Sequence, residues 1–297
     1  MTCFTGLSAF PITPASPEGR VDTAALRALI AALAATDITS IGLLGSTGTY
    51  AYLSRGERRR AIDTALEEAD GRVPIIVGVG ALRTDEAVAL AQDARVAGAA
   101  AGLLAAVSYT PLTDDEVFEH FSTVATRGGL PLCIYDNPGT THFRFTPSLV
   151  GRLAQVPGIA ALKSPAPDAD SAAGHLDSLS RAVPAGFRLG YSGDWNAAEA
   201  LLAGGETWYS VAAGLFPEPC LAILRAAQAG DAAQARTLNA RMQPLWDLFK
   251  EFSSLRVIYA AAGILDLCQA DPPRPILPLP EPVRERVADV VRRLDPA

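Results

Sequence analysis

Short apolar runs alternate with longer amphipathic stretches along most of the 297-residue chain. The runs have the length of buried strands, and their starts lie roughly 20 to 35 residues apart, the spacing of strands that alternate with helices. Eight such runs predict eight strands: Gly6–Phe10, Ser40–Leu44, Pro74–Val79, Ala101–Ala106, Pro131–Tyr135, Ile159–Lys163, Phe187–Tyr191 and Thr207–Val211.

The stretches between the predicted strands carry apolar residues at helical spacing. They predict helices at Thr23–Ala35, Ser54–Ala69, Thr84–Ala97, Thr113–Thr126, Pro147–Gln155 and Asn196–Ala203. Two of them begin with the S/T-x-x-E pattern of a helix start, at Ser54 and at Thr113. Strand–helix units repeated in this way predict an α/β fold, a (β/α)8 TIM barrel, with a doubly wound open sheet as the alternative.

Further helical patterns follow the eighth predicted strand, at Glu218–Ala229, Ala232–Phe252, Leu255–Leu267 and Glu281–Leu294. This is more helix than a barrel needs in order to close, so we expect a C-terminal helical appendage. No linker rich in Pro, Gly or Ser and no run of charge divides the chain into independent halves. We therefore predict a single domain over residues 1–297, with the barrel at 1–217 and the helical extension at 218–297.

The net charge narrows the kinds of partner. The formal charge is -7, whereas a surface for nucleic acid or for an anionic membrane needs clustered Lys and Arg. The first residues lack a basic stretch followed by an apolar core, and no apolar run reaches the roughly 18 to 20 residues that span a bilayer. These features predict a cytoplasmic protein that acts on a small molecule, without nucleic-acid or membrane partners.

The usual sequence signs of metal and disulfide chemistry are missing. The four cysteines form no C-x-x-C pair, and the three histidines form no H-x-H or H-x-x-x-H pair. We therefore expect no metal and no cofactor.

Lysine is scarce, because only Lys163 and Lys250 among 25 basic residues are lysines. Lys163 ends the sixth predicted strand, and the active sites of (β/α)8 barrels lie at the C-terminal ends of the strands. Burial disfavours an ammonium ion, so a lysine there can be a neutral amine that attacks a ketone, which Arg cannot do. The structural alternative is a lysine that extends its charge to solvent, and Lys250 in its helical pattern is interpreted in that way.

A Gly-Ser-Thr-Gly-Thr segment at residues 45–49 follows the second predicted strand. Its hydroxyls and free backbone N–H groups can hold a substrate carboxylate. An ordinary turn between a strand and a helix is the alternative.

Two tyrosines also lie at strand ends. Tyr135 ends the fifth predicted strand, next to the strand that carries Lys163, so its phenol can reach the amine or the substrate and move a proton. Tyr109 follows the fourth strand and can extend a hydroxyl relay through Ser46. The alternative for both tyrosines is a packing role.

The order and spacing of these motifs resemble the N-acetylneuraminate lyase and dihydrodipicolinate synthase superfamily. The similar elements run from end to end: Phe10-Pro-Ile-Thr-Pro, Gly45-Ser-Thr-Gly, Leu53-Ser-x-x-Glu57-Arg58, Tyr135-x-x-Pro138, Lys163, Ser192-Gly193-Asp194 and Ser210-Val211. The resemblance makes Lys163 the Schiff-base lysine and Tyr135 the catalytic tyrosine.

The resemblance also implies how pyruvate is bound. Ser46 and Thr47, with Gly48 beside them, correspond to the residues that bind its carboxylate. Tyr109 corresponds to a relay tyrosine that is often supplied across a subunit interface. The family forms dimers and tetramers, so a homo-oligomer is expected.

Three positions depart from the family pattern. Thr49 stands where Glu is usual, and Tyr209 where a small aliphatic residue is common. Thr140 stands where dihydrodipicolinate synthases carry an Arg for the second substrate's carboxylate, and a neutral hydroxyl does not replace a charge-assisted pair. We expect Thr140 and Tyr209 to contact substrate. Arg144 either supplies the missing charge or is a solvated loop residue.

These residues predict a class I, Schiff-base lyase that acts on pyruvate or on a 2-keto-3-deoxy acid. The reaction is of aldolase or dehydratase type, and the sequence does not decide between them. The alternatives are a true 4-hydroxy-tetrahydrodipicolinate synthase and a catalytically inactive barrel that binds a keto acid.

Overall fold

The computed structural model describes residues 3–294 of the chain, in which eight parallel strands close into a barrel in chain order. The strands are β1 (Gly6–Ala9), β2 (Ser40–Leu43), β3 (Ile75–Gly78), β4 (Ala101–Ala105), β5 (Leu132–Tyr135), β6 (Ile159–Pro165), β7 (Arg188–Ser192) and β8 (Thr207–Ser210). Pairing of β1 with β8, Leu7 opposite Trp208, closes the barrel. The predicted barrel is confirmed, and the open-sheet alternative is wrong.

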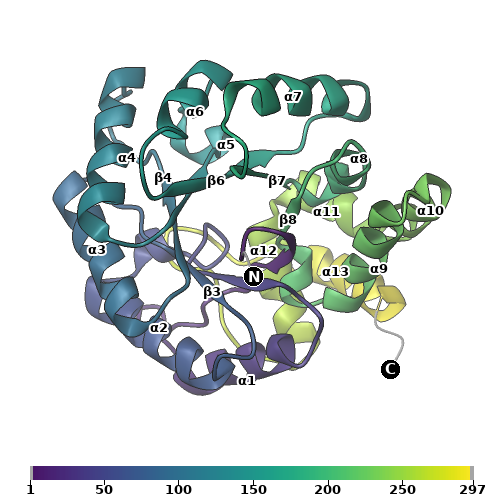
Figure 1. Ribbon diagram of the computed structural model, residues 1–297. Helices are drawn as coiled ribbons and strands as arrows, with labels where there is room; N and C mark the ends of the chain where they lie inside the picture. The colour runs from purple at the N-terminus through teal and green to yellow at the C-terminus, as the bar shows by residue number, and fades with distance from the viewer. Residues whose placement is uncertain (1–2, 295–297) are drawn as a thin grey trace.

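Helices surround the strands (Figure 1). They are α1 (Thr23–Ala34), α2 (Arg55–Ala69), α3 (Thr84–Ala97), α4 (Asp114–Gly128), α5 (Pro138–Thr141), α6 (Pro147–Leu153), α7 (Ala169–Ala182), α8 (Ala197–Leu202) and α9 (Pro217–Gln228). Three short 3-10 helices, η1 (Tyr50–Tyr52), η2 (Asp194–Asn196) and η3 (Ala212–Gly214), follow the ends of β2, β7 and β8. The sequence patterns did not predict α5, α7 or the 3-10 helices.

The two predicted helix starts differ in how they form. At Thr113 both hydrogen bonds of a capping box are present, because the Thr113 side chain accepts from the Glu116 backbone and Glu116 accepts from Thr113. At Ser54 the side chain accepts from the Glu57 backbone at 3.3 Å. The Glu57 carboxylate accepts instead from the Val21 backbone at 2.7 Å, so it ties α2 to the segment before α1.

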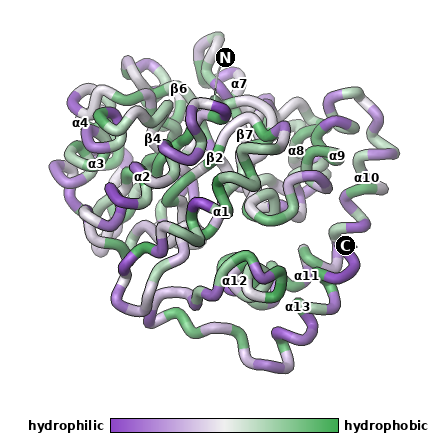
Figure 2. Tube along the Cα trace, turned by 90° about the horizontal axis from the view of Figure 1, so that it is seen from below, coloured by the Kyte–Doolittle hydropathy of each residue, from purple (hydrophilic) through white to green (hydrophobic). Residues whose placement is uncertain are grey.

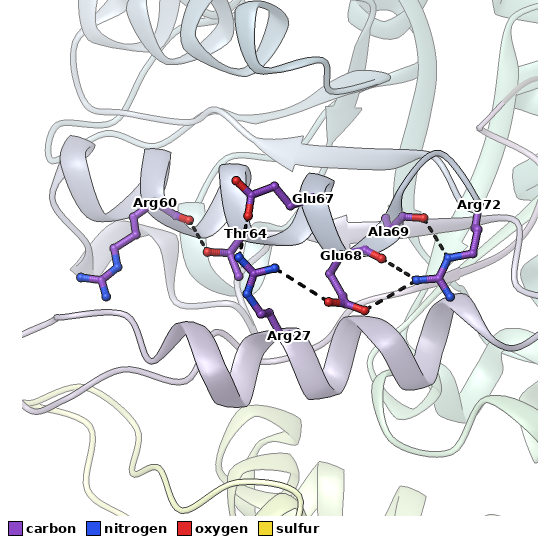
Figure 3. A network of polar contacts seen from close by, with 7 residues as sticks. All are labelled: Arg27, Arg60, Thr64, Glu67, Glu68, Ala69 and Arg72. Carbon is purple, nitrogen blue, oxygen red and sulfur yellow. Dashed lines mark hydrogen bonds and ion pairs between the residues drawn. The ribbon is translucent and has the colours of Figure 1, made fainter.

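Ion pairs join α1 to α2 at the surface (Figure 3). Arg27 pairs with Glu67 and, at 3.8 Å, with Glu68, which in turn lies 3.7 Å from Arg72. Exposed pairs of this kind contribute about 0 to 1 kcal/mol each. The buried apolar faces of the two helices therefore hold them together.

The remaining helices form an appendage, with α11, α12 and α13 together on one side of the barrel (Figure 2). The appendage comprises α10 (Ala232–Arg241), α11 (Gln243–Phe252), α12 (Ser254–Ile264) and α13 (Glu281–Leu294). The predicted helix Ala232–Phe252 is two helices, because Pro244 in the first turn of α11 cannot continue α10. Helix α9 contacts both β1 and α10, so the boundary at residue 217 stays a prediction.

Helix α12 docks against loops at the C-terminal ends of the strands. The Tyr259 hydroxyl donates to the backbone carbonyl of Thr13 at 3.4 Å and lies 3.5 Å from the hydroxyl of Thr49. These contacts bring the appendage to the end of the barrel where chemistry is expected.

Aromatic side chains fill the inside of the barrel. Phe10 and Tyr209 are at most 2% exposed, and their rings meet edge to face at 6.0 Å. Glycine is required around them, because a Cβ on Gly42 would lie 2.2 Å from the Phe10 ring and one on Gly190 would lie 2.6 Å from the Tyr209 ring. The result is a buried, aromatic environment below the barrel mouth.

Candidate active site

Lys163 lies on β6 within this aromatic environment and is 2% exposed. Its Nζ is 3.7 Å from the centroid of the Phe10 ring and 4.3 Å from that of Tyr135. Burial lowers the pKa of Lys163 to about 7, while attraction to Asp194 acts in the opposite direction. A large fraction of the side chain is therefore a neutral, nucleophilic amine near pH 7.

Tyr135 lies opposite Lys163 in the β5–β6 pair, and its hydroxyl contacts two polar side chains. Its hydroxyl lies 3.0 Å from the Ser46 hydroxyl, and the Asn137 side chain donates to it at 2.9 Å. Burial raises the pKa of Tyr135 to about 12, although the hydrogen bond to Ser46 lowers it. The phenol is thus protonated at neutral pH and able to donate a proton.

The loop after β2 is shaped by close packing. A Cβ on Gly45 would lie 2.7 Å from the Phe10 ring, which is too close, and a Cβ on Gly48 would lie 3.0 Å from the Leu44 backbone, which is tighter than most real contacts. Thr49 has a φ of 52°, in the left-handed region, and its N–H donates to the Ser46 carbonyl at 3.1 Å. This turn carries the Ser46 and Thr47 side chains. Within residues 3–294 the Thr47 hydroxyl has no hydrogen-bond partner, so it is free to meet a ligand oxygen.

Asp194 holds the ends of β7 and β8 together. Its carboxylate accepts from Trp208 Nε1 and from the Ala212 backbone, both at 2.8 Å. Burial raises the pKa of Asp194, and these two hydrogen bonds lower it. We interpret this residue of the Ser-Gly-Asp motif as a structural support for the site.

A cavity of about 340 Å³ opens at the barrel mouth. Its wall comes from the loop after β2, η1, the ends of β4 and β5, α5, and the appendage, through α12 and Ile276. Ser46, Tyr135 and Thr140 line it, and Tyr135 is the residue that both lines the cavity and contacts Lys163. A larger cavity, of about 670 Å³, lies between residues 15–22 and the appendage and holds none of the predicted site residues.

Other predicted site residues lie outside this cavity. Lys163, Thr47 and Gly48 are buried and are not part of its wall. Tyr209 is 0% exposed, and its hydroxyl is 3.6 Å from Cys133 Sγ. Substrate contact by Tyr209 stays a prediction, and its position favours packing below Lys163. Tyr109 is 97% exposed, so in the single chain it does not complete the relay of Ser46 and Tyr135.

Several site residues were missed by the sequence interpretation. Asn137 has a usable signal, because it follows Tyr135 by two residues and its amide can donate to the phenol oxygen. Phe10 looks like an ordinary core residue in the sequence. Arg256 lines the cavity from α12, and nothing in the sequence shows that the appendage folds back over the barrel.

Two further findings concern metal ions and membrane spans. Among residues 3–294, His, Cys, Asp and Glu side chains do not gather into any group that could hold a metal ion. Over the same part of the chain, each helix is too short or too polar to cross a membrane.

Comparison with known proteins shows which proteins the chain is similar to. The Dihydrodipicolinate synthetase family model matches residues 3–294. A 4-hydroxy-tetrahydrodipicolinate synthase from Methylococcus capsulatus is 37% identical over 286 residues, which is 95% of each protein. The crystal structure of a dihydrodipicolinate synthase from Agrobacterium tumefaciens has a TM-score of 0.96 at 57% identity and covers 99% of both chains.

A chloride-inhibited dihydrodipicolinate synthase from Acinetobacter baumannii, solved in complex with pyruvate, has a TM-score of 0.91 at 28% identity over 98% of this chain and 99% of that one. The expected family resemblance is confirmed, and with it the interpretation as a Schiff-base lyase. The chain belongs to the dihydrodipicolinate synthetase family.

Proposed function

We propose that the enzyme forms a Schiff base between Lys163 and pyruvate or another small 2-keto acid. The observation that carries this proposal is the buried Lys163 amine, with a pKa of about 7, in contact with the ring of a protonated Tyr135. A lysine with an ordinary pKa would be almost wholly ammonium at pH 7 and a poor nucleophile.

The reaction begins when the neutral amine adds to the keto carbon. Loss of water from the carbinolamine gives a ketimine, whose protonated nitrogen withdraws electrons from the neighbouring carbon C3. Loss of a C3 proton then gives an enamine, which attacks an aldehyde in an aldol addition. In a 2-keto-3-deoxy acid the same enamine can instead expel the hydroxyl on C4 as water.

Tyr135 has the position to move protons in these steps. Because Asn137 donates to the Tyr135 oxygen, the phenol's own proton is free to point to Ser46 or to the substrate. A positioned acid or base of this kind contributes about 10² to 10⁴-fold to a rate. Ser46, Thr47 and Gly48 would hold the keto acid's carboxylate at the barrel end of the cavity.

Tyr109 fits a role in an assembly. Its side chain is 97% exposed and so is accessible to a second chain, and the resemblance to the family supplies a reason, because there this tyrosine often enters a neighbouring subunit's site. We propose a homo-oligomer, a dimer or a tetramer, in which Tyr109 completes the partner's relay. A cytoplasmic location also remains a prediction.

The second candidate is a true 4-hydroxy-tetrahydrodipicolinate synthase, the name of the curated relatives. Thr140 argues against it, because this residue presents a neutral hydroxyl that donates to the Asn137 carbonyl at 3.2 Å. Arg144 does not compensate, since it is exposed and is not part of the cavity wall.

A panel of 2-keto acids tests the proposal. Each acid is incubated with the enzyme and borohydride, and the intact protein is weighed by mass spectrometry. We expect one reduced adduct with pyruvate or with a close analogue, whose mass identifies the carbon skeleton. Turnover assays with the acids that are trapped then separate an enzyme from a barrel that only binds. Failure of every acid to form an adduct would refute the proposal.

A further inference from the structure

Arg256 lies in the first turn of α12 and contributes to the wall of the active-site cavity. The surrounding wall residues from the appendage, Ser253, Leu255 and Ile276, are uncharged. Arg256 is the only charged side chain among the described residues that line this cavity, and no Asp or Glu lines it. The cavity therefore carries one fixed positive charge.

This guanidinium is half-buried and has no protein partner. No ion pair or hydrogen bond of its side chain is formed within residues 3–294. The buried Arg58 shows the contrast, because it donates to the carbonyls of Gly80 and Leu53 at 2.9 and 3.3 Å and so has a structural role. The donors of Arg256 remain available for an anion, and a guanidinium matches a carboxylate with two parallel hydrogen bonds.

We propose that Arg256 binds a second carboxylate, at the far end of the substrate from the Schiff base. The inference rests on the proposed function and names the class of its second substrate: a short aldehyde that carries a carboxylate and no amino group. An ammonium group in the cavity would meet Arg256 without an acidic side chain to offset it, and like charges brought together oppose binding.

The two ends of the cavity differ in a way that supports this assignment. Ser46 and Tyr135 belong to the barrel end, where Lys163 lies, whereas Arg256 belongs to the wall that the appendage contributes. Thr140 leaves the β5–α5 side of the cavity neutral. A volume of about 340 Å³ is near the lower limit for ligand pockets and suits a chain of a few carbons beyond the keto acid.

Three aldehydes with one carbon framework test the inference, each with pyruvate as the donor. Butanal has no charge, and succinic semialdehyde carries a terminal carboxylate. Aspartate semialdehyde carries both a carboxylate and an ammonium group. For the wild type we expect kcat/KM with succinic semialdehyde to exceed that with butanal about 10- to 100-fold, the effect of one charge-assisted interaction. Aspartate semialdehyde should be used less well than succinic semialdehyde.

The variant Arg256→Ala should bring the ratio of succinic semialdehyde to butanal close to one, while activity with butanal and the yield of trapped pyruvate stay at wild-type levels. Arg256→Lys should restore part of the ratio. Arg241→Ala, at an exposed arginine that ends α10, is the matched control and should keep the wild-type ratio. Thermal melting establishes that each variant is folded.

A carboxylate preference that survives in Arg256→Ala would overturn the inference. So would equal use of aspartate and succinic semialdehydes, or a wild type that traps pyruvate and uses none of the three aldehydes. If the wild type forms no pyruvate adduct, the proposed function itself fails, and this inference fails with it.

Discussion

The hydroxyl of Tyr135 lies 3.0 Å from the hydroxyl of Ser46, although 89 residues separate them in the chain. The barrel creates this contact, because the loop after β2 and the end of β5 meet at the same mouth. Tyr135 also contacts Lys163 with its ring, so a single side chain connects the amine to a polar proton path.

Replacing Tyr135 by Phe should separate imine formation from turnover. The variant keeps the ring against Lys163 and loses only the hydroxyl, so borohydride should still trap some pyruvate. Turnover should fall about 10² to 10⁴-fold, because a positioned acid or base is removed. The yield of trapped pyruvate and the turnover rate are both measured at saturating keto acid. Wild-type turnover in this variant would make Tyr135 a packing residue, and Tyr109 would be the next residue to test.

Replacing Thr47 by Val should act on binding. The change keeps the shape of the side chain and removes a hydroxyl that is proposed to meet the keto acid's carboxylate, so affinity for the keto acid should weaken by about 1 to 3 kcal/mol. Thr64→Val is the control, because Thr64 is also buried but donates within α2, to the Arg60 carbonyl. Equal pyruvate affinity in the two variants would remove Thr47 from the carboxylate site.

Asn137 should influence the proton path through Tyr135. Asn137→Ala removes the N–H that donates to the phenol oxygen, and one neutral hydrogen bond corresponds to about a 2- to 10-fold loss of turnover. Trapping of pyruvate should stay near the wild-type level, because the pKa of Tyr135 moves further above neutrality when its oxygen loses a donor and the phenol stays protonated. Thr141→Val, which loses a hydrogen bond to the Asn137 carbonyl, should keep wild-type turnover. Wild-type turnover in Asn137→Ala would show that its amide does not influence the proton path.

The rate of imine formation should follow the titration of Lys163. With a pKa of about 7, the neutral amine increases as pH rises, so the trapping rate at low pyruvate should grow about tenfold from pH 6 to pH 8 and then level off. Stopped incubations with borohydride across this range give the curve. A rate that continues to climb toward pH 10 would show a lysine with its ordinary pKa.

The sequence predicted the barrel well because buried strands leave a strong signal. The predicted strand Thr207–Val211 ends one residue beyond β8, and Ile159–Lys163 stops two residues before the end of β6. Helix α7 was missed because Ala, Ser, Asp and Gly make up most of it and only Ala172 and Leu179 are buried.

The candidate site was predictable to the extent that barrel geometry determines it. Lys163, Tyr135 and Ser46 all follow from the rule that chemistry lies at the C-terminal ends of strands. Arg256 could not be predicted, because its place in the cavity depends on how α12 docks against the Thr13 and Thr49 loops. That docking is a tertiary contact without a local sequence signal.

Trapping of pyruvate on Lys163 tests the central claim most directly. The wild type and Lys163→Ala are each incubated with pyruvate and borohydride, and the intact masses and the peptide that carries the adduct are determined, with Lys250→Ala as the matched control for the other lysine. We predict one reduced pyruvate adduct on the wild type and on Lys250→Ala, located at residue 163, and none on Lys163→Ala. An adduct that persists in Lys163→Ala, or that maps to Lys250, would contradict the assignment of Lys163 as the Schiff-base amine.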